Sequence, residues 1–171
     1  METKGDIQTP NSISPDGRLL AYGVFKAEFT RSEIWTVPIE GDRDHPRLGR
    51  AEPFLQTPAD LDTPAFSPDG RWLDYYSDES GAEEIYVRPF PGPGGQYQVS
   101  SGGGSRPIWA HDGRQLFFLD SQSRITVADC GVTRGSFAAG KPRLWSDKSL
   151  AFMGSNYSYA LSPDGKASRS C

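Results

Sequence analysis

Ser14-Pro15-Asp16-Gly17 is the first of three identical tetrapeptides in this chain. The same four residues return at 67–70 and 162–165, and a degenerate copy, Ala-His-Asp-Gly, occupies 110–113. The successive Asp-Gly pairs are separated by 53, 43 and 52 residues, close to the repeat length of a four-stranded β-propeller blade. The repetition predicts a chain built from several copies of one small β unit.

The tetrapeptide has the residue types of a tight turn. Pro presets φ at the second turn position, Asp accepts hydrogen bonds from the backbone that follows it, and Gly tolerates the left-handed conformation. Each copy is therefore expected to close a hairpin. In the strand after each of the first three turns, a Leu and an aromatic residue alternate as the pairs Leu20/Tyr22, Leu73/Tyr75 and Leu116/Phe118. The period of two predicts that each pair is buried between neighbouring sheets.

Further strands complete each unit. Third strands are predicted over 33–39, 84–90 and 124–128, and the clearest fourth strand over 96–99. The sequence thus predicts an all-β fold, a partial β-propeller of about three four-stranded antiparallel blades plus the start of a fourth. All lie in one domain, with blade units of approximately 6–57, 58–103, 104–155 and an incomplete 156–171.

Composition and charge agree with this class. The 171 residues are 36% hydrophobic, and 19 Gly and 14 Pro suit a chain that turns every few residues. The net charge of −4 argues against nucleic acid or an anionic membrane surface as the main partner. The polar segment 1–10 lacks the apolar region of a signal peptide, and no apolar run is long enough for a transmembrane helix. We expect no membrane insertion of this segment, which would stay cytoplasmic as expressed, whereas a parent protein attached to the membrane or in the periplasm stays open.

The repeated turn and its strands resemble the WD-repeat-like propeller repeats of the TolB type. This likeness covers nearly the whole chain. A closer one covers roughly 84–145, where EIYVRPFPGPGG at 84–95, QVSSGGGSRPIW at 98–109 and DGRQLFF at 112–118 resemble the propeller region C-terminal to the kinase domain of many bacterial Ser/Thr protein kinases. The resemblance implies a signalling parent in which the propeller accompanies a catalytic domain.

The chain also departs from that pattern. A propeller of this type needs six or more blades. Near the end of the sequence, Ser168 and Ser170 occupy positions where Leu and an aromatic residue are expected. We therefore expect a fragment of a larger protein with a truncated or frame-shifted ending. Its open blade faces should cause self-association, for example two copies completing a ring of about six blades, or marginal stability.

Catalytic motifs are not found in the sequence. The phosphate cover, His-Arg-Asp and Asp-Phe-Gly motifs of kinases do not occur, and the Gly-rich stretch 102–105 lacks the Gly-Lys-Ser/Thr of a phosphate loop. A serine hydrolase needs Gly-x-Ser-x-Gly, which 154–158 does not fit. His45 and His111 are the only histidines available as a base, and we expect His111 to be an exposed turn residue.

Cofactor and metal sites are not predicted either. Two His and two Cys match no zinc spacing, and the turn Asp residues lack the pattern of a calcium loop. Cys130 is expected to be a small core residue rather than a reactive thiol. We expect no enzyme activity and no catalytic, cofactor-binding or metal-binding residues.

The sequence-based hypothesis is a non-catalytic sensor or protein-interaction module with a protein or peptide partner. The loops 26–32, 78–83 and 121–123 would form a binding rim, and the four acids of 78–84 could attract a cationic partner. The basic run 43–50 is expected to be a solvated loop that connects two blades. The alternative hypothesis is the propeller part of a prolyl-oligopeptidase-like hydrolase, where it would gate a separate catalytic domain.

Overall fold

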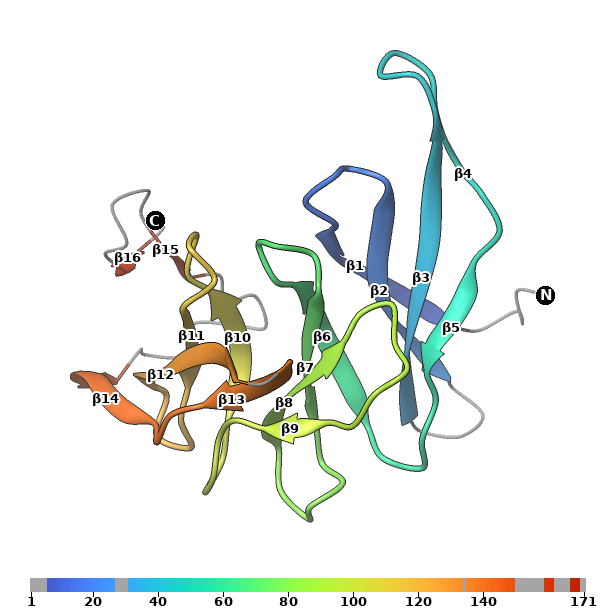
Figure 1. The fold of residues 1–171 in the computed structure, drawn as a ribbon. Coiled ribbons are helices and arrows are strands. Elements are labelled where there is room, and N and C mark those ends of the chain that lie inside the picture. Colours follow the sequence, from blue (N-terminus) through green and yellow to red (C-terminus); the bar gives the residue numbers. More distant parts are fainter. Residues whose placement is uncertain (1–5, 27–30, 134, 150–158, 162–166, 170–171) are drawn as a thin grey trace.

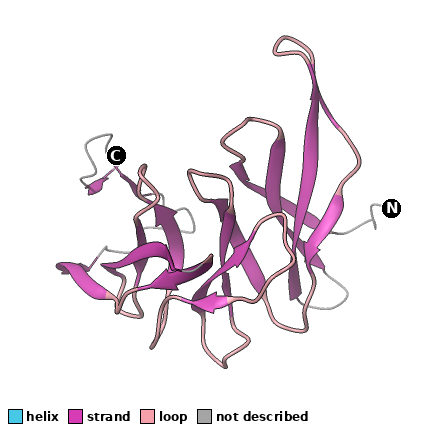
Figure 2. Cartoon of the chain, viewed as in Figure 1, coloured by secondary structure: helices cyan, strands magenta, loops and turns pink. Residues whose placement is uncertain are grey.

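The computed structural model shows three antiparallel sheets side by side, followed by a two-stranded hairpin (Figure 1). The structure describes residues 6–26, 31–133, 135–149, 159–161 and 167–169. Within these residues there are only strands and loops, as Figure 2 shows. The predicted all-β class is confirmed, and no described helix is available that could cross a membrane.

Each main sheet orders its four strands as they follow along the chain. The first sheet contains β1 (Ile7–Ile13), β2 (Leu19–Lys26), β3 (Arg31–Gly41) and β5 (Glu52–Leu55), with β4 (Pro46–Leu48) paired to the far end of β3. The second sheet contains β6 (Leu61–Phe66), β7 (Trp72–Ser77), β8 (Glu84–Pro89) and β9 (Tyr97–Gln98). The third contains β10 (Ser105–Trp109), β11 (Gln115–Leu119), β12 (Arg124–Thr133) and β14 (Arg143–Ser149), with β13 (Ser136–Ala139) paired to the end of β12. The final hairpin contains β15 (Tyr159–Leu161) and β16 (Ala167–Arg169).

The repeated tetrapeptide forms the turn between the first and second strands of a sheet. The Gly17 N–H donates to the Ser14 carbonyl at 2.8 Å, and Gly17 has a φ of 74°. The Asp16 carboxylate accepts the Ser14 hydroxyl at 2.6 Å and the Arg18 N–H at 3.1 Å. These bonds, the one from Ser14 foremost, lower the pKa of Asp16. The Ser14 hydroxyl also accepts the Leu19 N–H at 2.9 Å, so the turn and the start of β2 form one hydrogen-bonded unit.

The later turns repeat this arrangement with one simplification. In the second turn the Ser67 hydroxyl donates to Asp69 at 2.6 Å and accepts the Trp72 N–H at 3.0 Å. In the third turn Ala110 replaces Ser, and the Asp112 carboxylate keeps the bond from the Arg114 N–H at 2.9 Å. The predicted hairpin turns are confirmed at 14–17, 67–70 and 110–113, whereas the copy at 162–165 lies outside the described residues.

Successive turns also lie against one another. A Cβ built on Gly70 would lie 3.6 Å from Cδ of Pro15, and one built on Gly113 would lie 3.7 Å from Cδ of Pro68. At Gly17 nothing lies within 4 Å of the same position. The Pro of the first turn thus lies beside the Gly of the second, and the Pro of the second beside the Gly of the third, whereas Gly17 has no such neighbour among the described residues.

Two of the three predicted Leu/aromatic pairs are buried between sheets. Leu73 and Tyr75 pack against residues of the first sheet such as Ile34, and Leu116 and Phe118 pack against residues of the second. The side chains of Leu73, Leu116 and Ile34 have no exposed surface. Alternation along the second strand therefore identified the packed face correctly in these two sheets.

The prediction is wrong for Leu20 and Tyr22. Tyr22 is 7% exposed, but its cluster contains only residues of the first sheet and Ala51 from the loop before β5, so no other described sheet covers this face. Ile13 shows the difference, because it is 57% exposed whereas Phe66, at the same repeat position, is 7% exposed. The repeat places the same residue types at each position, but burial depends on whether a preceding sheet is present.

Two further expectations concern loops and the end of the chain. The basic run 43–50 does not connect blades, because it lies within the first sheet and contains β4 and the exposed turn before it. The strands β15 and β16 pair as the start of a fourth unit. The side chains of Ser168 and Ser170, on which the altered ending was predicted, lie outside the described residues.

Substituting Leu at equivalent repeat positions should have unequal effects. Leu116→Ala removes a fully buried side chain and should lower the free energy of unfolding by about 2–5 kcal/mol. Leu20→Ala removes a half-buried side chain from the uncovered face and should cost no more than about 1.5 kcal/mol. Urea unfolding measures both. Equal costs would show that Leu20 is covered in solution, and light scattering would then report whether a second copy covers it.

Candidate functional site

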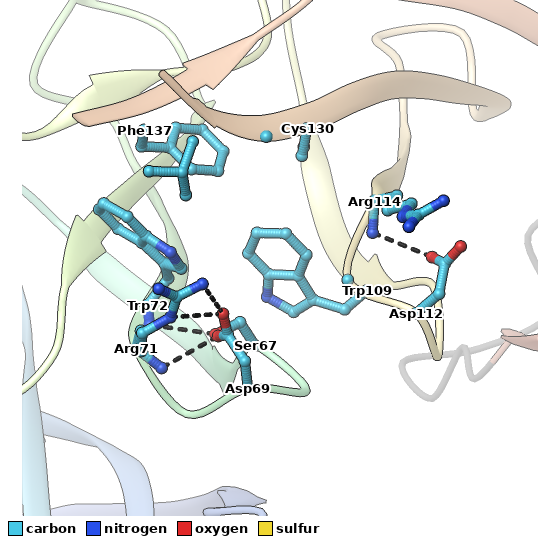
Figure 3. A pocket seen from close by; sticks show the side chains of 12 residues that line it. Ser67, Asp69, Arg71, Trp72, Trp109, Asp112, Arg114, Cys130 and Phe137 are labelled. Atoms are coloured by element: carbon cyan, nitrogen blue, oxygen red, sulfur yellow. Dashed lines mark hydrogen bonds and ion pairs between the residues drawn. The ribbon is translucent and has the colours of Figure 1, made fainter. Parts of the chain in front are cut away.

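A hollow of about 240 Å³ lies where the second and third sheets meet at their turn ends (Figure 3). We call it the turn pocket. It is lined by the turn of the second sheet, the turn of the third sheet and residues of the paired strands β12 and β13. Because both turns are fixed by their own hydrogen bonds, the pocket is bounded on two sides by rigid backbone.

Three aromatic side chains form the apolar wall of the turn pocket. Trp72 and Trp109 are each 8% exposed, and Phe137 is 5% exposed. The ring of Phe137 lies 5.2 Å from that of Trp72 and 6.2 Å from that of Trp109, measured between centroids. Phe137 reaches this position because β13 folds back onto the end of β12. The strand β13, which has no counterpart in the second sheet, therefore completes the pocket.

The rim carries two Arg and two Asp side chains, so its formal charge is zero. Arg71 pairs with Asp69 at 2.7 Å, and both side chains are partly exposed. Burial raises the pKa of Asp69, but hydrogen bonds from Ser67 and Arg71 outweigh it and lower the pKa overall. Asp69 is therefore ionised at neutral pH, and both of its oxygens are engaged.

One donor in the pocket wall has no acceptor. The Nε1 atom of Trp109 is buried and has no hydrogen-bond partner among the described residues. Figure 3 shows this nitrogen on the side of the indole that faces Arg71 and Asp69. A buried N–H without a partner costs about 1–3 kcal/mol.

Asp74 lies in the interface between the second and third sheets. It has no exposed surface, one oxygen accepts the Ala65 N–H at 3.1 Å, and the other has no partner among the described residues. Burial raises the pKa of Asp74 well above its ordinary value of 3.8, and the bond from Ala65 opposes this only in part. The carboxyl group is therefore held in its neutral form far more readily than in water.

The neighbouring Cys130 lines the pocket and packs against the aromatic cluster. Burial raises the pKa of its thiol to about 12. The thiol is protonated at neutral pH, which is the unreactive form. Cys130 therefore has the packing role that its position in the third strand indicated.

Neither histidine lines the turn pocket. His111 is exposed in the third turn, as predicted. His45 is exposed beside β4, where its ring nitrogen lies 3.2 Å from the carboxylate of Asp42. Over the described part of the chain, no three His, Cys, Asp or Glu side chains are grouped so as to hold a metal ion.

The Gly-rich stretch 102–105 leads from β9 into β10, and its backbone N–H groups bind an internal carboxylate. The N–H groups of Gly102 and Gly103 donate to Glu84 at 2.7 and 3.0 Å, and the Ser100 hydroxyl donates to the other oxygen of Glu84. Glu84 is 4% exposed, so it does not contribute to an acidic rim. The backbone donors that a phosphate would need are already used within the fold.

The described residues of the predicted rim loops do not line the turn pocket. Asp78 accepts the Asp60 N–H at 2.8 Å, and Glu79 contacts Gln96, so two acids of the loop have partners inside the chain. The turn at 121–123 connects β11 to β12, as expected. Residues 27–30 of the first rim loop and the stretch 154–158 lie outside the described residues.

The sequence did not single out the turn pocket. In the sequence, Trp109 appeared only as the last residue of the stretch 98–109, and Asp74 was not singled out. A partial signal was present for Asp74, because alternation places it on the same face of the strand as Trp72 and opposite Leu73. The unpaired nitrogen of Trp109 depends on the neighbouring sheet and leaves no sequence signal.

Solved structures with the same fold place these sheets in context. A protein assigned to TolB from Agrobacterium tumefaciens has 19% identity and a TM-score of 0.59, covering 83% of this chain and 52% of that chain. A protein assigned as a 6-phosphogluconolactonase from Bacteroides uniformis has 16% identity and a TM-score of 0.56, covering 92% and 46%. A puromycin-hydrolyzing peptidase from Mycobacterium tuberculosis has 15% identity and a TM-score of 0.53, covering 94% and 33%.

The fold is a partial TolB-like β-propeller. The predicted fold class is confirmed, with three four-stranded antiparallel sheets as blades. This chain spans between a third and about half of the length of the three structures. No protein-family model and no curated protein sequence matches it. The link to kinases stays a prediction.

Replacing Asp74 by Asn should change how stability depends on pH. The folded-state pKa of Asp74 is raised, so the folded protein holds this proton more tightly than the unfolded chain does. The contribution of Asp74 to wild-type stability should therefore fall as pH rises above 3.8. The amide cannot ionise and keeps an oxygen for the Ala65 N–H, so Asp74→Asn should gain stability relative to wild type between about pH 5 and pH 8. Urea unfolding across this range measures the gain, and a constant difference would contradict the assignment.

Proposed function

We propose that this propeller segment is a non-catalytic module that binds a protein or peptide, within a larger signalling protein. The turn pocket is the observation that carries this proposal. It combines an aromatic wall with a polar rim, which is the composition of a recognition surface. Propellers host many functions, so the argument comes from this pocket and not from the fold.

The size of the pocket favours a side chain over a cofactor. Pockets for small molecules and cofactors usually measure about 300–1,000 Å³. The turn pocket, at about 240 Å³, is smaller. It suits one residue of a peptide that lies across the turns of the second and third blades.

The chemistry of the lining favours binding over catalysis. Cys130 has a raised thiol pKa, which is the opposite of what a nucleophile needs. Asp69 is engaged by Ser67 and Arg71 and is not positioned as a general base toward a nucleophile. These residues offer contacts and shape, and they do not form an activated pair.

The signalling context comes from the sequence resemblance of 84–145 to kinase-associated propellers. The alternative is the propeller of a hydrolase, which the similarity in fold to the puromycin-hydrolyzing peptidase keeps open. The gene sequence on either side of this chain separates the two. A kinase domain upstream supports the first hypothesis, and a Gly-x-Ser-x-Gly domain downstream supports the second.

Blocking the turn pocket should abolish peptide binding. Val132 lines the pocket and is 44% exposed, so Val132→Trp should fill the pocket without disturbing the core. Thr133→Trp is the matched control, because Thr133 is the next residue, is exposed and does not line the pocket. A phage-displayed library of random peptides is selected on the wild-type chain. We expect selected peptides to bind Val132→Trp at least about tenfold more weakly and Thr133→Trp with unchanged affinity.

The proposal has two clear ways to fail. Selected peptides that bind Val132→Trp as tightly as wild type would place binding elsewhere. A library that gives no specific peptide for the wild-type chain would contradict a peptide-binding role.

A further inference from the structure

We propose that the uncovered face of the first sheet is an interface with a second copy of this chain, in which two such faces pack against each other around a two-fold axis. The face contains a hollow of about 780 Å³, lined by residues of β1, β2 and β3 and of the segment 48–53. Tyr22, Val24 and Val37 form its apolar floor. This surface is separate from the turn pocket, so the pairing does not depend on the proposed function.

The equivalent face is covered in the other two main sheets. Ile13 pairs with Leu20 across β1 and β2, so both side chains lie on the uncovered face, and Ile13 is 57% exposed. Phe66 and Trp109, at the same repeat position, are 7% and 8% exposed, because a preceding sheet packs against them. Leu48, at the edge of the hollow, is 64% exposed. The first sheet therefore presents apolar surface that favours association.

The far face of the third sheet cannot supply the missing cover, because it is already occupied. Phe117 and Val127 lie on that face and are each 1% exposed, and Leu161 of the final hairpin packs against their cluster. A head-to-tail arrangement would have to displace this hairpin. Two copies therefore associate most readily through their first sheets, which gives a closed pair with the same patch on both sides.

The charges around the hollow suit such a pair. Asp6 and Lys26 pair with each other at 2.7 Å. Arg50 and Glu52 are exposed, and neither side chain has an ion pair or hydrogen bond among the described residues. They flank Ala51, which packs against the apolar floor. With the two-fold axis near Ala51, Arg50 of each copy meets Glu52 of the other, so the face is complementary in charge to itself.

The pairing should be weak. One sheet face is a small interface, and interfaces that bury less than about 1,200 Å² in total are usually weak or transient. We expect a dissociation constant on the order of 100 μM, so that at a few micromolar the copies separate and the first sheet is uncovered. Sedimentation velocity from about 5 to 500 μM should show a reversible equilibrium between monomer and dimer.

A charge placed at the edge of the hollow should disrupt the pair. Leu48→Glu should weaken pairing at least about tenfold, because each copy then brings an uncompensated carboxylate into an apolar contact. Leu144→Glu is the matched control, since Leu144 is also an exposed leucine, at 46%, but lies on the third sheet. We expect the control to change the dissociation constant less than about twofold. Equal losses would place the third sheet in the contact and overturn the proposal.

Charge reversal tests the two-fold arrangement with exposed residues that the fold does not need. Arg50→Glu and Glu52→Arg should each self-associate at least about fivefold more weakly than wild type, because like charges then meet twice. An equal mixture of the two variants should form a mixed dimer about as tightly as wild type, since opposite charges again meet at both contacts. A mixture that associates no better than the single variants would contradict the arrangement.

Three other results would overturn the proposal. The first is a wild-type chain that stays monomeric over the whole concentration range. The second is growth beyond dimers, which a closed pair does not allow. The third is a monomeric wild type whose selected peptides lose binding to Leu48→Glu, since this would assign the uncovered face to a peptide instead of a second copy.

Discussion

The hydrogen bonds that a turn Asp accepts within its own tetrapeptide are the interaction on which the rest of the structure depends. In the first two turns one carboxylate oxygen receives both the Ser hydroxyl and the N–H that follows Gly, and the hydroxyl receives the N–H of the next strand. This closes the hairpin and sets the register in which Ile13 pairs with Leu20 and Phe66 with Leu73. Register then decides which side chains of each second strand face the preceding sheet.

Stacking of the sheets follows from these hairpins. The Pro of one turn contacts the Gly of the next, and the Leu and aromatic side chains behind the turns interlock between sheets. The second sheet is covered on both faces, whereas the first keeps one face without a covering sheet. The turn pocket forms at the end of the same interface, where Trp109 and Trp72 meet the returning strand β13. The indole nitrogen of Trp109 and one carboxylate oxygen of Asp74 are polar atoms buried in this interface without a partner among the described residues. Such atoms are costly in an otherwise apolar contact.

The local features were predictable, and the features that depend on neighbours were not. The turns, the third strands and the buried faces of Leu73 and Leu116 follow from residue types at short range. The partial exposure of Leu20 could not be predicted, because the sequence places Leu at the same position in all three repeats. The extra strands β4 and β13 carry weak strand patterns and pair with the far ends of β3 and β12. The binding of Glu84 by Gly102 and Gly103 joins residues far apart in the sequence, so a stretch that resembled a flexible connection is held in place.

The central claim is that each blade is stabilised by the blades that cover its two faces. Native-state hydrogen exchange measures this directly, because amide protection reports the local free energy of opening. The account predicts that the paired amides of β7 and β8, in the sheet covered on both faces, exchange most slowly, and that those of β1 and β2 exchange much faster. Equal protection of β2 and β7 would contradict the account, since it would mean that the first sheet does not need a neighbour on its uncovered face.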